Sequence, residues 1–289
     1  MMKWWPAPAK LNLFLHITGQ RADGYHELQT AFQFLDHGDK LKFTITECAD
    51  IVLKTGLPQV LAEDNLIVRA AKKLQTFTKT THGAEIELIK KLPMGGGLGG
   101  GSSDAATTLV ALNALWGCGL DDVTLANLGL QLGADVPVFV RGRASWAEGV
   151  GEKLTFITPP EPWYLVLFPG CEVSTKEIFS AYELTRDCEP MTIPGFLAGK
   201  GSNICEPVVK KLHPPVAQAL EWLAQYAATP RMSGTGSCVF ASFASADEAE
   251  TILEKVPGYW QAFTAKGCNE SPLRLCVKDF EKGLNVTAN

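Results

Sequence analysis

The most constraining feature of this sequence is a glycine-rich segment between a predicted strand and a predicted helix. Residues 93–103 have the sequence Pro-Met-Gly-Gly-Gly-Leu-Gly-Gly-Gly-Ser-Ser, with six glycines. Where side chains do not block the approach, backbone N–H groups can converge on an anion. The following helix adds free N–H groups and the positive end of its dipole. We therefore interpret the segment as a phosphate-binding loop, because the alternative, a flexible linker, seldom lies between a strand and a capped helix.

The spacing of the glycines leaves several nucleotide-binding classes to compare. Gly95, Gly97 and Gly100 also match G-x-G-x-x-G, which alone is a weak signal for dinucleotide binding. That fold needs a second parallel strand ending in an acidic residue about 20 positions on, whereas residues 121–122 (Asp-Asp) follow a glycine turn and are typical of a helix cap. A Walker loop is excluded because Ser102, and not Lys, follows the last glycine. Protein kinases are excluded because the sequence has no HRD or DFG triplet.

Hydrophobic periodicity predicts both strands and helices along the whole chain. We expect strands at residues 10–18, 28–35, 41–46, 84–90, 163–168 and 238–243. We expect helices at 65–75, 105–116, 123–132, 174–184, 216–227 and 246–256, the first of them capped by residues 63–65 (Glu-Asp-Asn). In the first strand, leucines and Ile17 alternate with Lys10, Asn12, Phe14 and His16, which predicts one core face. Residues 102–104 (Ser-Ser-Asp) are expected to cap the helix after the glycine loop. The proline-rich residues 158–162 mark a boundary between two lobes, 1–158 and 159–289, and the second is expected to be α+β.

Composition narrows the possible partners. The net charge is −5, and Lys and Arg are scattered, so we expect neither nucleic acid nor a membrane surface as a partner. The eight cysteines form no C-x-x-C pair, which favours free thiols over a zinc or redox site. Residues 1–8 lack the pattern of a signal peptide, and we expect a cytoplasmic protein.

The glycine loop resembles the ATP loop of the GHMP kinase superfamily (galactokinase, homoserine kinase, mevalonate kinase and phosphomevalonate kinase), whose pattern is Pro-x-Gly-x-Gly-Leu-Gly-Ser-Ser. Two further segments of that superfamily occur in the expected order, residues 8–13 and residues 233–240. The resemblance implies a two-lobed α+β architecture, with an N-terminal lobe similar to ribosomal protein S5 and a ferredoxin-like C-terminal lobe. It also implies ATP and Mg²⁺ as cosubstrate and cofactor.

Three segments resemble one branch of this superfamily more closely, namely residues 9–13, 21–28 and 132–139. Members of that branch phosphorylate the 2-hydroxyl of CDP-methylerythritol in the non-mevalonate (MEP) route to isoprenoid precursors. The resemblance implies the same reaction here. Three alternatives stay open: a superfamily kinase for another small alcohol such as homoserine or mevalonate, a ligand-binding protein without turnover, and a nicotinamide oxidoreductase. A requirement for the cytidine part of the substrate would distinguish the implied reaction from that of a kinase for another small alcohol.

The resemblance also assigns roles to two charged residues. It implies that Asp135 is the general base and that Lys10 stabilises the carboxylate charge and orients the acceptor hydroxyl. The pattern alone favours a solvated strand lysine at Lys10 and allows a helix cap at Asp135.

Binding residues follow from the same resemblance. The ATP loop comprises Pro93, Met94, Gly95, Gly96, Gly97, Leu98, Gly99, Gly100, Gly101, Ser102 and Ser103. The substrate residues comprise Asn12, Tyr25, His26, Phe32 and Phe179, with Tyr182 as the alternative to Phe179 for stacking on the cytosine opposite Tyr25. The second-lobe glycine motif, expected near the phosphates, comprises Gly234, Thr235, Gly236 and Ser237. Core packing is the alternative for each aromatic residue, and a hairpin turn is the alternative for the glycine motif. Metal ligands are not assigned, since Asp104 is equally a conceivable ligand and a helix cap.

Overall fold

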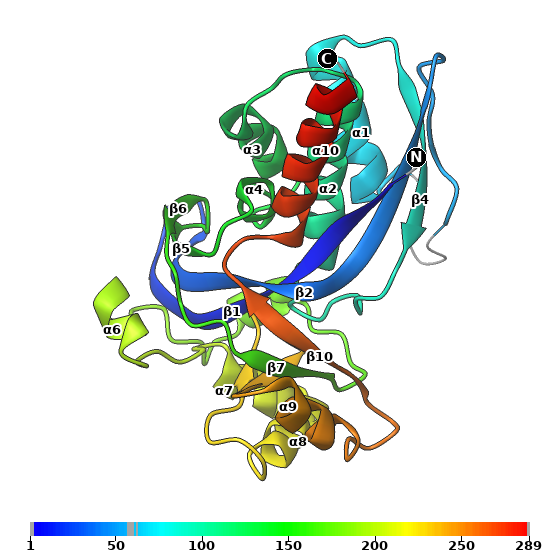
Figure 1. The fold of residues 1–289 in the computed structure, drawn as a ribbon. Helices are drawn as coiled ribbons and strands as arrows, with labels where there is room; N and C mark the ends of the chain where they lie inside the picture. The colour runs from blue at the N-terminus through cyan, green and yellow to red at the C-terminus, as the bar shows by residue number, and fades with distance from the viewer. Residues whose placement is uncertain (1–2, 57–60, 62, 288–289) are drawn as a thin grey trace.

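A long antiparallel pair of strands, β1 (Trp4–Gln20) and β2 (His26–Thr46), forms the centre of the first lobe (Figure 1). The protein is described by a computed structural model that covers residues 3–56, 61 and 63–287. The strands that complete the sheet of this lobe are β3 (Ile51–Leu53), β4 (Gly83–Ile89), β5 (Ser145–Gly149) and β6 (Lys153–Phe156). β2 pairs with both β4 and β5, so one strand organises most of this sheet.

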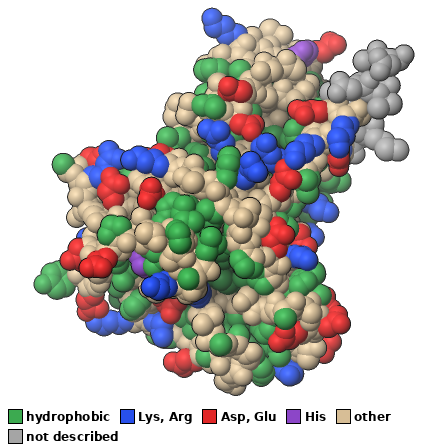
Figure 2. All heavy atoms as spheres, turned by 60° about the vertical axis from the view of Figure 1, so that its left-hand side comes forward, with side chains coloured by type: hydrophobic (Ala, Val, Ile, Leu, Met, Phe, Trp, Pro, Cys, Tyr) green, Lys and Arg blue, Asp and Glu red, His purple; other side chains and the backbone are tan. Residues whose placement is uncertain are grey.

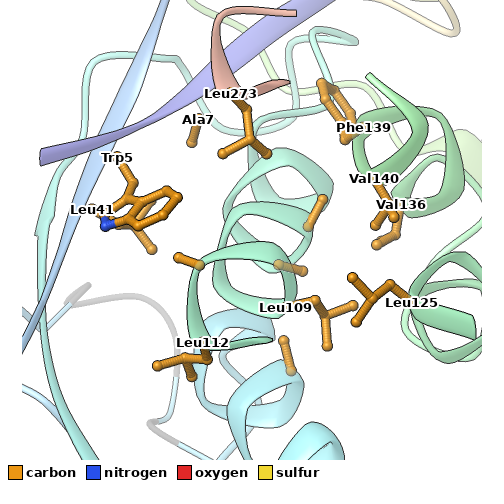
Figure 3. Close-up of a cluster of buried hydrophobic side chains, with 14 of the residues drawn as sticks. Trp5, Ala7, Leu41, Leu109, Leu112, Leu125, Val136, Phe139, Val140 and Leu273 are labelled. Carbon is orange, nitrogen blue, oxygen red and sulfur yellow. The ribbon is translucent and has the colours of Figure 1, made fainter. Parts of the chain in front are cut away.

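Five helices cover one face of this sheet and bury the first hydrophobic core (Figures 1 and 3). They are α1 (Leu66–Thr78), α2 (Gly100–Leu115), α3 (Asp122–Leu130), α4 (Val136–Arg141) and α10 (Pro272–Thr287). Figure 3 shows Leu109 and Leu112 of α2 between Trp5 of β1 and Leu125 of α3. The central helix α2 is rich in small residues, which lets sheet and helices approach it closely on several sides.

The second lobe is built around β7 (Trp163–Phe168), which pairs with β9 (Val239–Phe243) on one side and β10 (Gln261–Cys268) on the other. A short strand, β8 (Arg231–Met232), completes this part of the sheet. The helices are α5 (Thr175–Ser180), α6 (Ile193–Leu197), α7 (Glu206–Leu212), α8 (Pro214–Leu223) and α9 (Ala246–Leu253). The apolar side chains of α5, α7, α8 and α9 form a second core cluster with those of β7 and β9, whereas Phe196 of α6 belongs to a third cluster.

β10 joins the two lobes, because it pairs with β7 and also with β2. The chain then returns to the first lobe, where Leu273 and Cys276 of α10 belong to the first core cluster and α10 lies beside α2 (Figure 1). A division of the chain at residues 158 and 159 stays a prediction, and the last helix packs on the lobe that the N-terminal half builds.

Many predicted elements are confirmed, and their ends show the local chemistry. The strand predicted at 163–168 has those bounds, and Asn65 caps α1 by accepting a hydrogen bond from the N–H of Ile67 at 2.9 Å. Asp121 caps α3 in the same way through the N–H of Thr124 at 2.8 Å. The helix predicted at 174–184 is wrong in its length, since α5 ends at Ser180 and Ala181 has extended backbone.

Three further expectations need correction. The strands predicted at 28–35 and 41–46 are one strand, β2, in which Gly38 lies so close to β1 that a Cβ there would be 2.2 Å from the carbonyl oxygen of Ala7. The expected cap at residues 102–104 is wrong because α2 begins at Gly100. The prediction of one core face for β1 is also wrong: Lys10, Asn12 and Phe14 are buried like the leucines, because the second lobe and the glycine loop cover the other face.

None of the helices within the described residues has the length and hydrophobicity needed to cross a bilayer. On the face in Figure 2, basic and acidic side chains are interspersed, as their scatter in the sequence predicts.

Candidate active site

A cavity of about 580 Å³ lies between the lobes. Its walls include β1, β2, the glycine loop, α5 and the turn after β8, so both lobes contribute. The predicted site residues in its lining are Lys10, Asn12, Phe32, Asp135, Phe179, Gly234 and Thr235, together with residues 93–102. A pocket with several convergent polar groups, formed by segments distant in the sequence, is the expected place for a ligand.

The glycine loop has a conformation that glycine allows and other residues resist. Gly95, Gly97 and Gly99 all have positive φ, at 65°, 74° and 73°. Gly99 is the N-cap of α2, and no side chain accepts a hydrogen bond from the first turn of the helix. Those N–H groups therefore remain available for an anion that carries several oxygens.

The second-lobe glycine motif packs directly on this loop. The N–H of Cys238 donates to the carbonyl oxygen of Gly96 at 3.1 Å. Ser233, which is fully buried, donates from its hydroxyl to the carbonyl oxygen of Gly97 at 2.9 Å and accepts from the N–H of Asn12 at 3.2 Å. One hydroxyl thus ties together the glycine loop, β1 and the turn of the second lobe.

The serines that end the loop have different surroundings. Ser102 lines the cavity. Ser103 is fully buried, and its hydroxyl donates to the carbonyl oxygen of Pro8 at 2.7 Å. Ser237 is also fully buried, with its hydroxyl on the carbonyl oxygen of Cys171. The hydroxyls of Ser103 and Ser237 therefore hold the framework of the site.

A lysine and a carboxylate meet at the base of the loop. The Nζ of Lys10 lies 3.3 Å from an Oδ of Asp135, and also donates to the Oδ1 of Asn12. The Lys10 side chain is 4% exposed and the Asp135 side chain 34%, so the lysine is fixed by its surroundings while the carboxylate faces the cavity. Phe32 forms one wall, with its ring centroid 5.3 Å from the Lys10 ammonium.

The structure excludes a solvated strand lysine at Lys10 and a side-chain helix cap at Asp135. Lys10 is buried, not solvated, and its backbone N–H donates to the carbonyl oxygen of Leu98 in the glycine loop at 3.0 Å. Asp135 is in the N-cap position of α4, but its side chain caps no N–H group there. Its carboxylate is therefore available for an interaction in the cavity.

A second charged cluster lies beside the start of α2, and no local pattern predicts it. The Nζ of Lys90 contacts carboxylate oxygens of Asp39 at 2.5 Å and Asp104 at 3.0 Å. Asp39 also accepts from the N–H groups of Lys91 and Leu92, at 2.6 and 2.8 Å. The second oxygen of Asp104 is buried without a hydrogen-bond partner among the described residues. Asp104 is therefore a buried ion-pair residue and not a helix cap.

The predicted cytidine residues are only partly brought together. The rings of His26 and Phe179 are stacked, with centroids 5.0 Å apart and an interplanar angle of 21°. Tyr25 and Tyr182 are 65% and 98% exposed, and neither lines the cavity. Phe179 belongs to the cavity lining and His26 does not, so the cavity reaches this stacked pair at Phe179.

The cavity lining also contains residues that the sequence did not single out. The hydroxyl of Thr175 is hydrogen-bonded to that of Thr235, a residue of the predicted glycine motif, with their oxygens 2.9 Å apart. Thr30 accepts from the Nδ2 of Asn12 at 2.9 Å and so orients that side chain. Thr175 and Thr30 lack a local sequence signal, because only the packing of distant segments brings each of them to its partner.

Comparison with known proteins agrees with this geometry. The model of the GHMP kinases N terminal domain matches residues 65–143, and that of the GHMP kinases C terminal domain matches residues 192–262. The chain is 58% identical over 277 residues to 4-diphosphocytidyl-2-C-methyl-D-erythritol kinase from Nitrosococcus oceani, covering 96% of this chain and 99% of the relative. The kinase of the same name from Halorhodospira halophila is 54% identical, with 96% and 98% covered.

Solved structures give the same result for the fold. A crystal structure of 4-(cytidine 5'-diphospho)-2C-methyl-D-erythritol kinase matches with a TM-score of 0.81 and 32% identity, over 92% of this chain and 99% of that chain. The homoserine kinase from Cytophaga hutchinsonii matches with a TM-score of 0.69 at 18% identity, over 94% and 96% of the two chains. The second match concerns the fold alone.

Proposed function

The chain belongs to the 4-diphosphocytidyl-2-C-methyl-D-erythritol kinases of the GHMP kinase family, and from this premise we propose its reaction. It transfers the γ-phosphoryl group of ATP to the 2-hydroxyl of 4-diphosphocytidyl-2-C-methyl-D-erythritol, which gives the 2-phosphate and ADP. The reaction belongs to the non-mevalonate route to isoprenoid precursors, and we place it in the cytoplasm. The observation that carries the proposal is the Lys10–Asp135 pair, 3.3 Å apart beside the glycine loop.

The glycine loop supports the ATP half of the reaction. Phosphoryl transfer needs positioning of the phosphates and neutralisation of their charge more than covalent help from the protein. The uncapped N–H groups at the start of α2 supply donors, and the positive φ values of Gly95, Gly97 and Gly99 keep the backbone close to the anion. Residues 93–102, Gly234 and Thr235 thus line the proposed phosphate site, and the buried hydroxyls of Ser103 and Ser237 hold its framework.

Asp135 and Lys10 support the acceptor half. The Asp135 carboxylate takes the proton of the 2-hydroxyl as the hydroxyl oxygen bonds to the γ-phosphorus, and the bond from that phosphorus to the β–γ bridging oxygen breaks to release ADP. Lys10 is held by Asn12 and lies against Phe32, so its ammonium cannot leave the reaction centre. It stabilises the negative charge that develops on the transferred group.

We propose Mg²⁺ as the ion that accompanies ATP, bound mainly by the phosphates. Among the described residues, no group of three or more His, Cys, Asp or Glu side chains could hold a metal. Mg²⁺ is often bound through substrate phosphates with only one or two protein oxygens, so it does not require such a group. The Ser102 hydroxyl is the protein oxygen we propose for it, and the ion would spread the phosphate charge.

The pyrimidine end of the substrate is proposed to bind at His26 and Phe179. The stacked pair presents an apolar ring face and a polar edge, which suits a base that is recognised by stacking and hydrogen bonding. Tyr25 is exposed in the adjoining turn, and we propose that it covers the other face of the cytosine.

The proposal is tested by incubating the purified protein with MgATP and one acceptor at a time. The acceptors are the CDP-linked substrate, free methylerythritol, homoserine and mevalonate, and phosphorus NMR detects a new phosphomonoester. We expect a product only with the CDP-linked compound. Phosphorylation of another alcohol in its place would contradict the proposed substrate, and no product from any acceptor would contradict the proposed reaction.

A further inference from the structure

Arg186 connects the two aromatic residues of the proposed pyrimidine site. It lies in the segment after α5, and its Nη2 donates to the carbonyl oxygens of Phe179 at 2.9 Å and Ala181 at 2.8 Å. Its Nη1 donates to the carbonyl oxygen of Leu184 at 2.9 Å, and its Nε donates to the Nε2 of His26 at 3.2 Å. Four of the five N–H groups of the guanidinium are therefore used on this one site.

Three of these bonds explain the conformation of the chain around Phe179. α5 is only six residues long, and its last carbonyl groups have no partner in a following turn of helix. The guanidinium supplies that partner from within the same segment. Arg186 thereby fixes where α5 ends and holds the backbone that carries the Phe179 ring.

The fourth bond determines which nitrogen of His26 carries the proton. A guanidinium has only donors, so the Nε2 of His26 must accept. A neutral imidazole has one N–H group, and a doubly protonated ring could not accept at all. His26 is therefore neutral with its proton on Nδ1, because its Nε2 accepts from Arg186.

We propose that Arg186 is a positioning residue for the pyrimidine: it holds His26 as the Nδ1–H tautomer and stacks it against Phe179. This inference rests on the proposed function, since it names the base that the site takes. Cytosine has acceptors at O2 and N3, whereas uracil carries a hydrogen on N3. An Nδ1–H donor matches the cytosine edge, so Arg186 contributes to selection of the cytidine substrate without touching it.

The charges around His26 agree with a neutral ring. Burial lowers the pKa of His26, and the nearby positive charge of Arg186 lowers it further. In the turn that carries His26, Arg21 pairs with Asp23 at 3.0 Å and with Glu27 at 4.0 Å, so these charges are directed at each other. On α5, Glu177 pairs with His213 at 3.7 Å. Arg186 is thus the charge that acts on the imidazole.

The first test compares Arg186→Met with Lys211→Met. Lys211 pairs with Glu183 in the same segment but is exposed and does not contact His26, so its variant is a matched control. We expect Arg186→Met to raise KM for the CDP-linked substrate about tenfold, the effect of losing one charge-assisted hydrogen bond, while kcat and KM for ATP change less than twofold. The control should match wild type. Equal KM values for Arg186→Met and wild type would overturn the inference, whereas an inactive wild-type protein would contradict the proposed function instead.

A second measurement does not depend on how well the variant folds. Nitrogen-15 NMR of the imidazoles in the wild-type protein at pH 7.5, assigned with a His26→Gln variant, distinguishes the tautomers directly. We expect the Nδ1 of His26 to be protonated and the Nε2 to be unprotonated. A protonated Nε2, alone or in a cationic ring, would overturn the assignment. Arg186→Lys should restore part of the lost affinity, because an ammonium can still donate to Nε2.

Discussion

Replacement of Ser233 by alanine tests whether one hydroxyl joins the two lobes at the phosphate loop. The side chain is fully buried, donates to the carbonyl oxygen of Gly97 at 2.9 Å and accepts from the N–H of Asn12 at 3.2 Å. Alanine is nearly isosteric, so the change removes the two hydrogen bonds and little packing. It leaves a carbonyl oxygen and an N–H group without their partner.

The size of the effect follows from those two groups. A buried polar group without a partner costs about 1–3 kcal/mol, so for the two groups we expect the free energy of unfolding to fall by about 2–6 kcal/mol. Gly97 belongs to the glycine loop, so this loop would be less ordered in the variant. ATP binding would then have to order the loop, and the free energy of binding would become less favourable. We expect KM for ATP to rise about fivefold, equivalent to about 1 kcal/mol.

Urea unfolding measures the first effect, and steady-state kinetics with varied ATP measures the second. Ser242→Ala is the control, because Ser242 is exposed on β9 and lies outside the loop contacts. A Ser233→Ala protein with a stability within about 0.5 kcal/mol of wild type and an unchanged KM for ATP would refute the reasoning that this hydroxyl couples the lobes.

Two further predictions concern the nucleotide side of the site. Gly97→Ala places a Cβ 2.2 Å from the carbonyl oxygen of Ser233 at a φ of 74°, so calorimetry should show that the affinity for ATP falls by about a hundredfold or more. Gly258→Ala is the control and should bind ATP normally, because its Cβ would meet nothing within 4 Å. Tight ATP binding by Gly97→Ala would contradict the proposal that this loop binds the phosphates. Burial raises the pKa of Asp104 to about 7, with Lys90 opposing and Asp39 adding to the rise. The folded protein therefore holds a proton that the unfolded chain has lost between about pH 4 and pH 7, and its free energy of unfolding falls as the pH rises through that window, by about 1.4 kcal/mol from pH 6 to pH 8. Asp104→Asn has no carboxyl group to titrate at this position, so its urea midpoint should rise relative to that of wild type between pH 6 and pH 8. Parallel pH profiles of the two midpoints would contradict the raised pKa of Asp104.

Local patterns were enough to locate the glycine loop between a strand and a helix, and its binding of phosphate stays a proposal. The run of glycines, the strand before it and the helix after it lie within one stretch of sequence, so the loop could be located without tertiary information. The caps at Asn65 and Asp121 were visible for the same reason, because a cap is decided by residues two or three positions apart.

Residues whose roles depend on packing could not be found in this way. Lys90 is an ordinary charged residue in sequence, and only the folded chain brings it to Asp39 and Asp104. The burial of Lys10 has a similar origin, since an alternating strand predicts a solvent face and the second lobe covers it. α5 ends early because Arg186, six residues after the last helical residue, binds its final carbonyl groups. Hydrophobic periodicity cannot predict such a contact. The division into lobes at residue 158 and the individual ligand contacts stay predictions.

Turnover of the CDP-linked substrate by wild type and by Asp135→Asn, compared in the same assay, tests the role of Asp135 as general base. The variant keeps the size of the side chain and removes its ability to take the hydroxyl proton. We predict that kcat falls by about a hundredfold or more while the dissociation constant for ATP, measured by calorimetry, changes less than about twofold, because Asp135 faces the acceptor and not the loop amides. An Asp135→Asn protein that turns over the substrate at the wild-type rate would contradict the assignment of the general base, and with it the account of how this site transfers a phosphoryl group.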